Sequence, residues 1–122
     1  MDILSAIIDS IEGIRLPSVS EESDIHALIS NAFSENGLVF SHEKRLSCGL
    51  RPDFMVGSIA VEVKKNKPSQ RMLLRQIESY LSCDEITEIV VVSQRHIKLP
   101  QTVCGKAVHS VFLDCLWGVS LP

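Results

Sequence analysis

The sequence predicts an α/β fold in which helices flank a central mixed sheet, and three observations carry this prediction. Residues 2–15 and 21–35 repeat apolar side chains every three or four positions, as amphipathic helices do. Two short apolar runs flank Gly57-Ser58, a pattern typical of two strands joined by a tight turn. A helical pattern at 69–81 then separates this hairpin from the apolar run 89–92, which favours a β-α-β unit with parallel strands.

The first two helices have recognisable ends. Gly13 and Pro17 end the first helix, because neither residue continues a helix well. Ser20 is expected to cap the second helix, with acidic residues in the first turn favoured by the helix dipole. This second helix is expected to stop at Asn36-Gly37.

The remaining elements are expected to be strands and loops. Residues 38–46 alternate loosely and predict the first strand of a three-stranded antiparallel meander that ends at Lys64. Glu43 lies on this strand and either faces the functional site or occupies an exposed edge. Residues 94–106 are expected to form a loop, and residues 108–113 a last strand.

Composition indicates one globular domain covering residues 1–122. Of the 122 residues, 45% are hydrophobic and 22% charged, which is enough apolar content for one core. No apolar run approaches the roughly 18 residues of a membrane span, so we expect no membrane association. The N-terminus lacks the basic segment of a signal peptide, so we expect a cytoplasmic protein. The four cysteines show no metal-ligand spacing and are expected to be reduced thiols.

Two charged residues interrupt the second strand of the hairpin. Strand side chains alternate between faces, so Ala60, Glu62 and Lys64 share one face of this strand. A carboxylate and an ammonium in an otherwise hydrophobic strand are costly unless they serve a purpose. Asp53 begins the neighbouring strand, and two carboxylates from adjacent strands can hold a hard divalent cation. Beside that cation, Lys64 can orient an attacking water or stabilise charge.

At these residues the chain resembles the PD-(D/E)xK nuclease superfamily. The signature consists of Pro52-Asp53, eight intervening residues and Glu62-Val63-Lys64. The resemblance implies a restriction-endonuclease-like αβββαβ core over residues 19–95, with an extra N-terminal helix and a C-terminal strand. It also implies a Mg²⁺-dependent deoxyribonuclease in which Asp53, Glu62 and Lys64 are catalytic and Mn²⁺ substitutes for Mg²⁺.

The resemblance extends to the helices on either side of the motif. Glu22 best matches the helix glutamate that completes the metal site in many members, and Glu21 is the alternative. The alternative interpretation is that Glu21 and Glu22 only cap the helix and bind no metal. His26 follows on the same helix and is interpreted as a packing residue. Gln76 and Tyr80 match the QxxxY element of the RecB-like branch, where this element supports the site and contacts substrate. Within the superfamily the chain thus resembles a small RecB-like or Holliday-junction-resolvase-like nuclease.

Charge gives mixed evidence about nucleic acid. The net charge of −3 and the pI of about 5.8 do not indicate a nucleic-acid-binding protein. Five cations without an intervening acid nevertheless lie between Lys64 and Arg75, beside the proposed catalytic lysine. The predicted DNA contacts are Lys65, Lys67, Arg71, Arg75, Gln76 and Tyr80.

Other functions stay open on the sequence. The same fold can serve as a catalytically silent module for nucleic-acid binding or assembly, and the charged strand face can be the protein interface of a small regulatory protein. The chain shows no extra domain for target recognition. Specificity for DNA would therefore come from a homodimer, from an unidentified protein partner, or from DNA structure.

Overall fold

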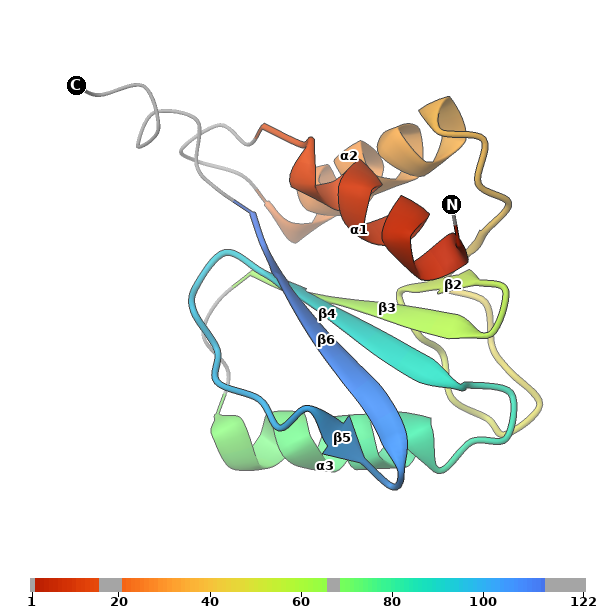
Figure 1. The fold of residues 1–122 in the computed structure, drawn as a ribbon, viewed down its shortest axis with the longest axis vertical. Helices are drawn as coiled ribbons and strands as arrows, with labels where there is room; N and C mark the ends of the chain where they lie inside the picture. The colour runs from red at the N-terminus through yellow and green to blue at the C-terminus, as the bar shows by residue number, and fades with distance from the viewer. Residues whose placement is uncertain (1, 16–20, 66–68, 114–122) are drawn as a thin grey trace.

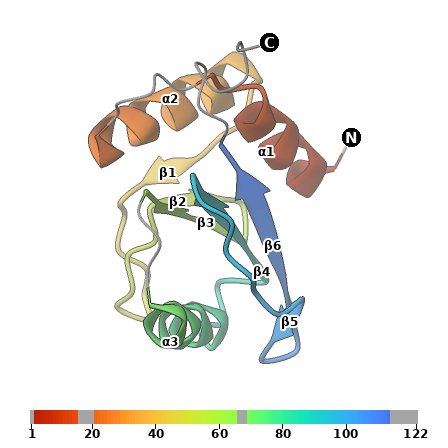
Figure 2. The ribbon, with the colours of Figure 1, turned by 90° about the vertical axis from the view of Figure 1, so that its left-hand side faces the viewer.

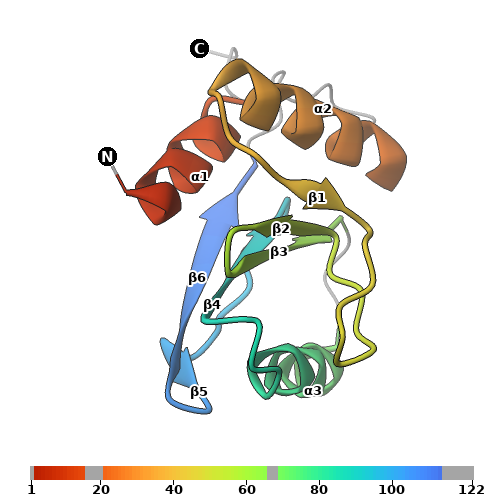
Figure 3. The ribbon, with the colours of Figure 1, turned by 90° about the vertical axis from the view of Figure 1, so that its right-hand side faces the viewer.

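The computed structural model describes residues 2–15, 21–65 and 69–113, and over these residues it confirms the α/β class. Three helices flank a six-stranded mixed sheet (Figure 1). Helices α1 (Ile3–Glu12) and α2 (Glu22–Glu35) cover one face of the sheet, and α3 (Gln70–Leu81) covers the other (Figures 2 and 3). The expected layered arrangement is therefore present.

The sheet combines a hairpin with a parallel crossover. Its strand order is β1-β2-β3-β4-β6-β5. The pairs β1/β2, β2/β3 and β5/β6 are antiparallel, whereas β3/β4 and β4/β6 are parallel. Helix α3 connects β3 to β4, as the expected β-α-β unit requires. The strand bounds are β1 Ser41–His42, β2 Phe54–Val56, β3 Ile59–Lys64, β4 Glu88–Ser93, β5 Thr102–Val103 and β6 Lys106–Phe112.

Strand β3 shows the predicted alternation of side chains. Ile59, Val61 and Val63 belong to the apolar cluster under α1 and α2. Ala60 belongs to the second cluster, under α3. Glu62 therefore lies on the α3 face, inside a protein layer, and only 4% of the residue is exposed. The sheet thus buries a carboxylate on the same face as the apolar cluster under α3.

Helices α1 and α2 end at the glycines that the sequence predicted, but the N-cap of α2 differs from the predicted residue. Gly13 caps α1 at its C-terminal end, and Gly37 follows α2 with a left-handed φ of 73°, both as expected. The N-cap of α2 is Glu21 instead of Ser20, which lies outside the described residues. The backbone N–H of Glu21 donates to Asp24 Oδ2 at 2.9 Å, so an acidic residue three positions along satisfies this helix end.

Two strand boundaries also differ from the predictions. Of residues 38–46, only Ser41–His42 form a strand, because Glu43 adopts a left-handed φ of 53° that ends the extended backbone. The predicted loop at 94–106 contains β5, and β6 begins at Lys106. A turn at Cys104-Gly105, where both φ angles are positive, closes this second hairpin.

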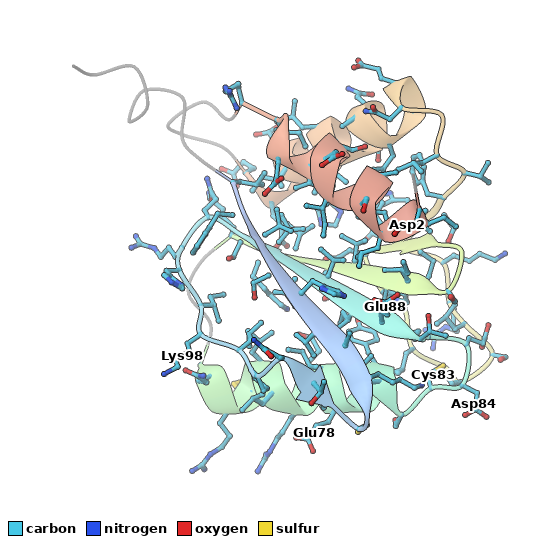
Figure 4. The ribbon with its side chains drawn as sticks, in the orientation of Figure 1. Asp2, Glu78, Cys83, Asp84, Glu88 and Lys98 are labelled. Atoms are coloured by element: carbon cyan, nitrogen blue, oxygen red, sulfur yellow. A yellow bond between two sulfur atoms is a disulfide. The ribbon has the colours of Figure 1, made fainter. Side chains whose placement is uncertain are left out.

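A disulfide links the long β1–β2 loop to the end of α3. Cys48 and Cys83 are bonded, with their Cα atoms 6.1 Å apart (Figure 4 labels Cys83). The expectation of four reduced thiols is therefore wrong for this pair, because two cysteines distant in sequence become neighbours in the fold. No helix in the described part of the chain is long and apolar enough to span a membrane. The cytoplasmic location stays a prediction.

Removing the disulfide should destabilise the fold. The bond closes a loop over a sequence separation of 35 residues. The chain-entropy relation gives about 4 kcal/mol for a loop of this size. Cys48→Ser should therefore lower the melting temperature by on the order of 10 °C without reductant. Circular dichroism melts measure this change.

Cys104→Ser is the matched control, because Cys104 is exposed and free. This variant should melt like the wild type. Unreduced, unfolded protein should also titrate two thiols fewer than the reduced chain. Equal melting temperatures for the two variants would contradict the disulfide.

Candidate functional site

The site begins with a reciprocal pair of hydrogen bonds across the β2–β3 hairpin. The backbone N–H of Asp53 donates to Glu62 Oε1 at 2.8 Å. The backbone N–H of Val63 donates to Asp53 Oδ2 at 2.8 Å. Each carboxylate is thus held through one oxygen by the backbone of the opposite strand. The structure therefore brings together the two acidic residues that the motif predicted.

Glu62 has an environment that makes its charge costly. Its side chain is 5% exposed, and its Oε2 lies 3.8 Å from Lys64 Nζ. Gln76 Nε2 donates to the same oxygen at 3.3 Å. Burial, and next the negative charge of Asp53, raise the pKa of Glu62 to about 7. A cation bound between the two carboxylates would remove this cost and keep Glu62 ionised.

Gln76 and Tyr80 lie behind Glu62 on one side of α3. They are four residues apart and therefore stack along the helix. The hydroxyl of Tyr80 donates to the carbonyl of Arg51 at 3.3 Å. Burial, together with the charge of Glu62, raises the pKa of Tyr80 well above its ordinary value. Tyr80 is only 6% exposed, so it positions the site and offers little surface to a substrate.

His26 is a site residue that the sequence interpretation missed. It projects from α2, and its Nε2 lies 3.7 Å from Asp53 Oδ2. This nitrogen is buried and makes no hydrogen bond in the described structure. A buried nitrogen beside a carboxylate is more than a packing contact, because an unsatisfied polar atom costs free energy. Its position four residues after Glu22, on the same side of the helix, was the available signal.

Glu22 lies at the N-terminal end of α2, on the approach to Asp53 and Glu62 that the sequence predicted for a glutamate. It is the exposed first residue of α2 and lines a hollow of about 330 Å³ with His26, His42 and Glu43. Among the described residues, Glu22, Asp53 and Glu62 do not form a group whose ligand atoms all lie within 4.8 Å of one another. Glu21, the alternative, is the N-cap and exposed. His26 shares this approach from α2, with its Nε2 3.7 Å from Asp53 Oδ2.

The predicted cationic contacts are divided between surface and site. Arg71 and Arg75 are exposed on α3, and Lys65 is half-buried just after β3. Lys67 lies outside the described residues. Lys64, with a side chain 23% exposed, reaches from solvent to Glu62. Arg71 and Arg75 lie about half a turn around α3 from the buried Leu73 and Ile77, so they face away from the sheet and from Lys64.

The residues present fit a hard divalent cation. Carboxylate oxygens are the ligands that Mg²⁺ and Mn²⁺ prefer, and two of them converge here. Asp53 Oδ1 makes no hydrogen bond with the described residues, so this oxygen stays available. The orphaned nitrogen of His26 faces the same carboxylate. The donor set and the raised pKa of Glu62 both agree with a cation at this place.

Stability should depend on pH through Glu62. Its pKa of about 7 exceeds its ordinary value of 4.5, so the folded chain binds this proton more tightly than the unfolded chain. The stabilisation is complete below pH 4.5 and is lost as pH rises through about 7. Its size is on the order of 3 kcal/mol. Glu62→Gln should remove this loss, as melting temperatures between pH 4.5 and 8 in chelator-treated buffer would show.

Glu78→Gln is the matched control, because Glu78 is exposed on the same helix that covers Glu62. This variant should keep the pH dependence of the wild type. Added Mg²⁺ should reduce the loss at high pH in the wild type and not in Glu62→Gln. An equal pH dependence in wild type and Glu62→Gln would show that Glu62 is not the titrating group.

Comparison with protein-family models, with curated proteins and with solved structures gave no match to this chain. The case for a function therefore depends on the residues and their geometry. The strongest part of that geometry is the pair of carboxylates with Lys64 beside them.

Proposed function

We propose that the chain is a Mg²⁺-dependent nuclease that hydrolyses phosphodiester bonds of DNA. The observation that carries the proposal is the buried carboxylate of Glu62, held against Asp53 and 3.8 Å from an ammonium group. A fold does not keep a carboxylate at this cost without compensation. A divalent cation and a phosphate substrate would supply that compensation.

The proposal also includes the restriction-endonuclease-like core. The β2–β3 hairpin begins directly after Asp53, and α3 and the parallel strand β4 follow it. This order of elements agrees with that core and supports the assignment. The position of Gln76 and Tyr80 on α3, behind Glu62, supports it as well. The added elements are α1 before this core and the β5–β6 hairpin after it.

Each residue has a role in this proposal. Asp53 and Glu62 would hold Mg²⁺, or Mn²⁺ in its place, and Glu22 or His26 would supply a further group from α2. The bound cation would polarise a phosphate oxygen and lower the pKa of a bound water. Lys64 would place its ammonium beside the attacking water, where negative charge develops. The side-chain amide of Gln76 would keep Glu62 oriented. The hydroxyl of Tyr80 would hold the β1–β2 loop in place through the carbonyl of Arg51.

DNA is the proposed partner, despite the net charge of −3. Lys64 and Lys65 follow Glu62 at the end of β3 and supply the positive charge nearest to it, and Arg71 and Arg75 on the outer face of α3 add to the positive potential of this region. Two copies related by a two-fold axis would cut both strands of a duplex, which is why a homodimer is expected. A separate targeting protein is the other route to specificity.

Cleavage should be tested first on a panel of substrates. Plasmid, linear, single-stranded and four-way-junction DNA are incubated with Mg²⁺, Mn²⁺ or EDTA. The proposal expects cleavage of at least one substrate, abolished by EDTA and by Asp53→Ala. Calorimetry with Mn²⁺ should show binding to the wild type and loss in Asp53→Ala. Metal and DNA binding without cleavage would support the silent module instead.

Lys64→Ala should separate catalysis from metal binding. The ammonium meets charge that develops only during attack on phosphorus, so its loss affects turnover more than ground-state affinity. The cleavage rate should fall by on the order of a hundredfold. Mn²⁺ affinity should stay near wild type. Single-turnover kinetics and calorimetry measure the two quantities.

Lys65→Ala is the matched control, because Lys65 follows directly and makes no ion pair with Glu62 in the described structure. Its cleavage rate should change much less. Equal losses for both lysine variants would assign Lys64 to general DNA attraction and would remove it from the catalytic set.

A further inference from the structure

Three potential metal ligands converge beside the nuclease site without belonging to the predicted motif. Ligand atoms of His26, His42 and Glu43 all lie within 4.8 Å of one another. His26 Nδ1 and His42 Nε2 share a hydrogen bond of 2.8 Å, which a bound metal would replace, and His42 Nε2 is 3.6 Å from Glu43 Oε1. Two imidazoles and one carboxylate therefore lie close together, His26 from α2, His42 from β1 and Glu43 from the residue that follows β1.

The two imidazole rings are held in place by aromatic packing. The ring of His42 stacks on Phe54, with centroids 4.8 Å apart and an interplanar angle of 29°. The ring of His26 lies 5.4 Å from Phe54 and 5.1 Å from His42. The side chain of His26 is only 12% exposed. The nitrogens are thus positioned before any ligand arrives, which reduces the entropy lost on binding.

The backbone at Glu43 brings the third ligand to the same side. Consecutive residues of an extended strand point to opposite faces, so His42 and Glu43 would ordinarily diverge. The left-handed φ of 53° at Glu43 breaks this alternation. A glutamate in this conformation costs about 1 kcal/mol or more, and such strain concentrates at functional sites. The strained residue here is the one whose carboxylate lies beside His42.

The spacing suits a transition-metal ion. Two nitrogens bound to a tetrahedral zinc ion at its usual bond lengths lie about 3.3 Å apart. The distances of 2.8 Å and 3.6 Å in this cluster lie on either side of that value. Imidazole nitrogens favour zinc, cobalt and nickel over Mg²⁺, and two histidines with one carboxylate form a known zinc donor set.

The second nitrogen of His26 strengthens this interpretation. Metal-bound histidines usually direct their other nitrogen toward a carboxylate or carbonyl, which fixes the tautomer. His26 Nε2 lies 3.7 Å from Asp53 Oδ2 and is otherwise unpartnered among the described residues. With a metal on Nδ1, the proton would move to Nε2 and face the carboxylate. The buried nitrogen would then carry a proton 3.7 Å from a carboxylate oxygen, which favours that tautomer electrostatically.

We propose that His26, His42 and Glu43 bind a divalent transition-metal ion of the zinc class, with an open coordination position. That position faces the hollow of about 330 Å³ between α2 and His42, so water or a small anionic ligand can reach it. His42 and Glu43, with side chains 38% and 47% exposed, give the ion access from solvent. Its ligands do not include Asp53, Glu62 or Lys64. His26, whose Nε2 faces the nuclease site, would bind this ion through Nδ1, and His42 and Glu43 belong to this site alone, so their substitution tests it separately from the nuclease.

Cobalt spectroscopy tests the proposal on the full chain. The protein is freed of metal with EDTA, desalted and kept without reductant, so that Cys48 and Cys83 stay bonded and offer no thiolates. Co²⁺ is added at pH 7.5 and visible absorption is recorded, with Zn²⁺ competition to follow. The wild type should show one equivalent of Co²⁺ with bands typical of nitrogen and oxygen ligands, displaced by Zn²⁺. His42→Ala and Glu43→Gln should each weaken binding at least about tenfold.

His109→Ala is the matched control. His109 also pairs with a carboxylate, Glu88 at 2.9 Å, but this pair has no third ligand within the described residues. Its substitution should leave Co²⁺ binding unchanged. Circular dichroism of His42→Ala should show a folded chain, since that ring is partly exposed. No Co²⁺ binding by wild type, or equal losses for His42→Ala and His109→Ala, would overturn the site.

The same measurements separate this site from the nuclease site. A chain that binds Co²⁺ through His42 but never cleaves DNA retains the zinc-class site and loses the proposed function. A chain that cleaves DNA with Mg²⁺ at wild-type rate in His42→Ala, but shows no Co²⁺ spectrum, retains the nuclease and loses this site.

Discussion

The reciprocal hydrogen bonds between Asp53 and the Glu62-Val63 segment are the constraint on which the rest of the site depends. They join the first residue before β2 to the end of β3 through both carboxylates. Backbone N–H groups at this point would otherwise be unpaired, because β2 is only beginning. The same bonds that complete the sheet thus determine where two negative charges lie. Structure and proposed chemistry depend on the same atoms.

Because Glu62 is buried, its ionisation depends strongly on pH and on any bound cation. The α3 layer covers Glu62, and Gln76 supplies a donor to one of its oxygens. The protein compensates the charge only in part, since the pKa of Glu62 still rises to about 7. Near neutral pH the metal-free site therefore exchanges a proton readily. A cation that binds there must displace that proton, which links metal affinity to pH.

Local sequence patterns predicted the two carboxylates at the centre of the site. The residues around them depend on tertiary contacts that the sequence does not reveal. Asp53 and Glu62 were predictable because a two-residue turn and strand alternation place them opposite each other. His26 and His42 were not, because their rings meet only after α2 packs over the start of the sheet. Cys48 and Cys83 illustrate the same limit, since nothing in their spacing reveals the contact. The predicted strand at 38–46 was mostly wrong because one left-handed residue ended it.

That left-handed residue has a consequence for how the sequence can change. Glycine adopts a φ of 53° without strain, so Glu43→Gly would relieve a cost of roughly 1 kcal/mol at an exposed position. Selection for folding alone would favour glycine there. A directed-evolution experiment that rewards only thermal stability should accordingly enrich glycine or asparagine at position 43, and the selected variants would have exchanged a carboxylate for an unstrained backbone.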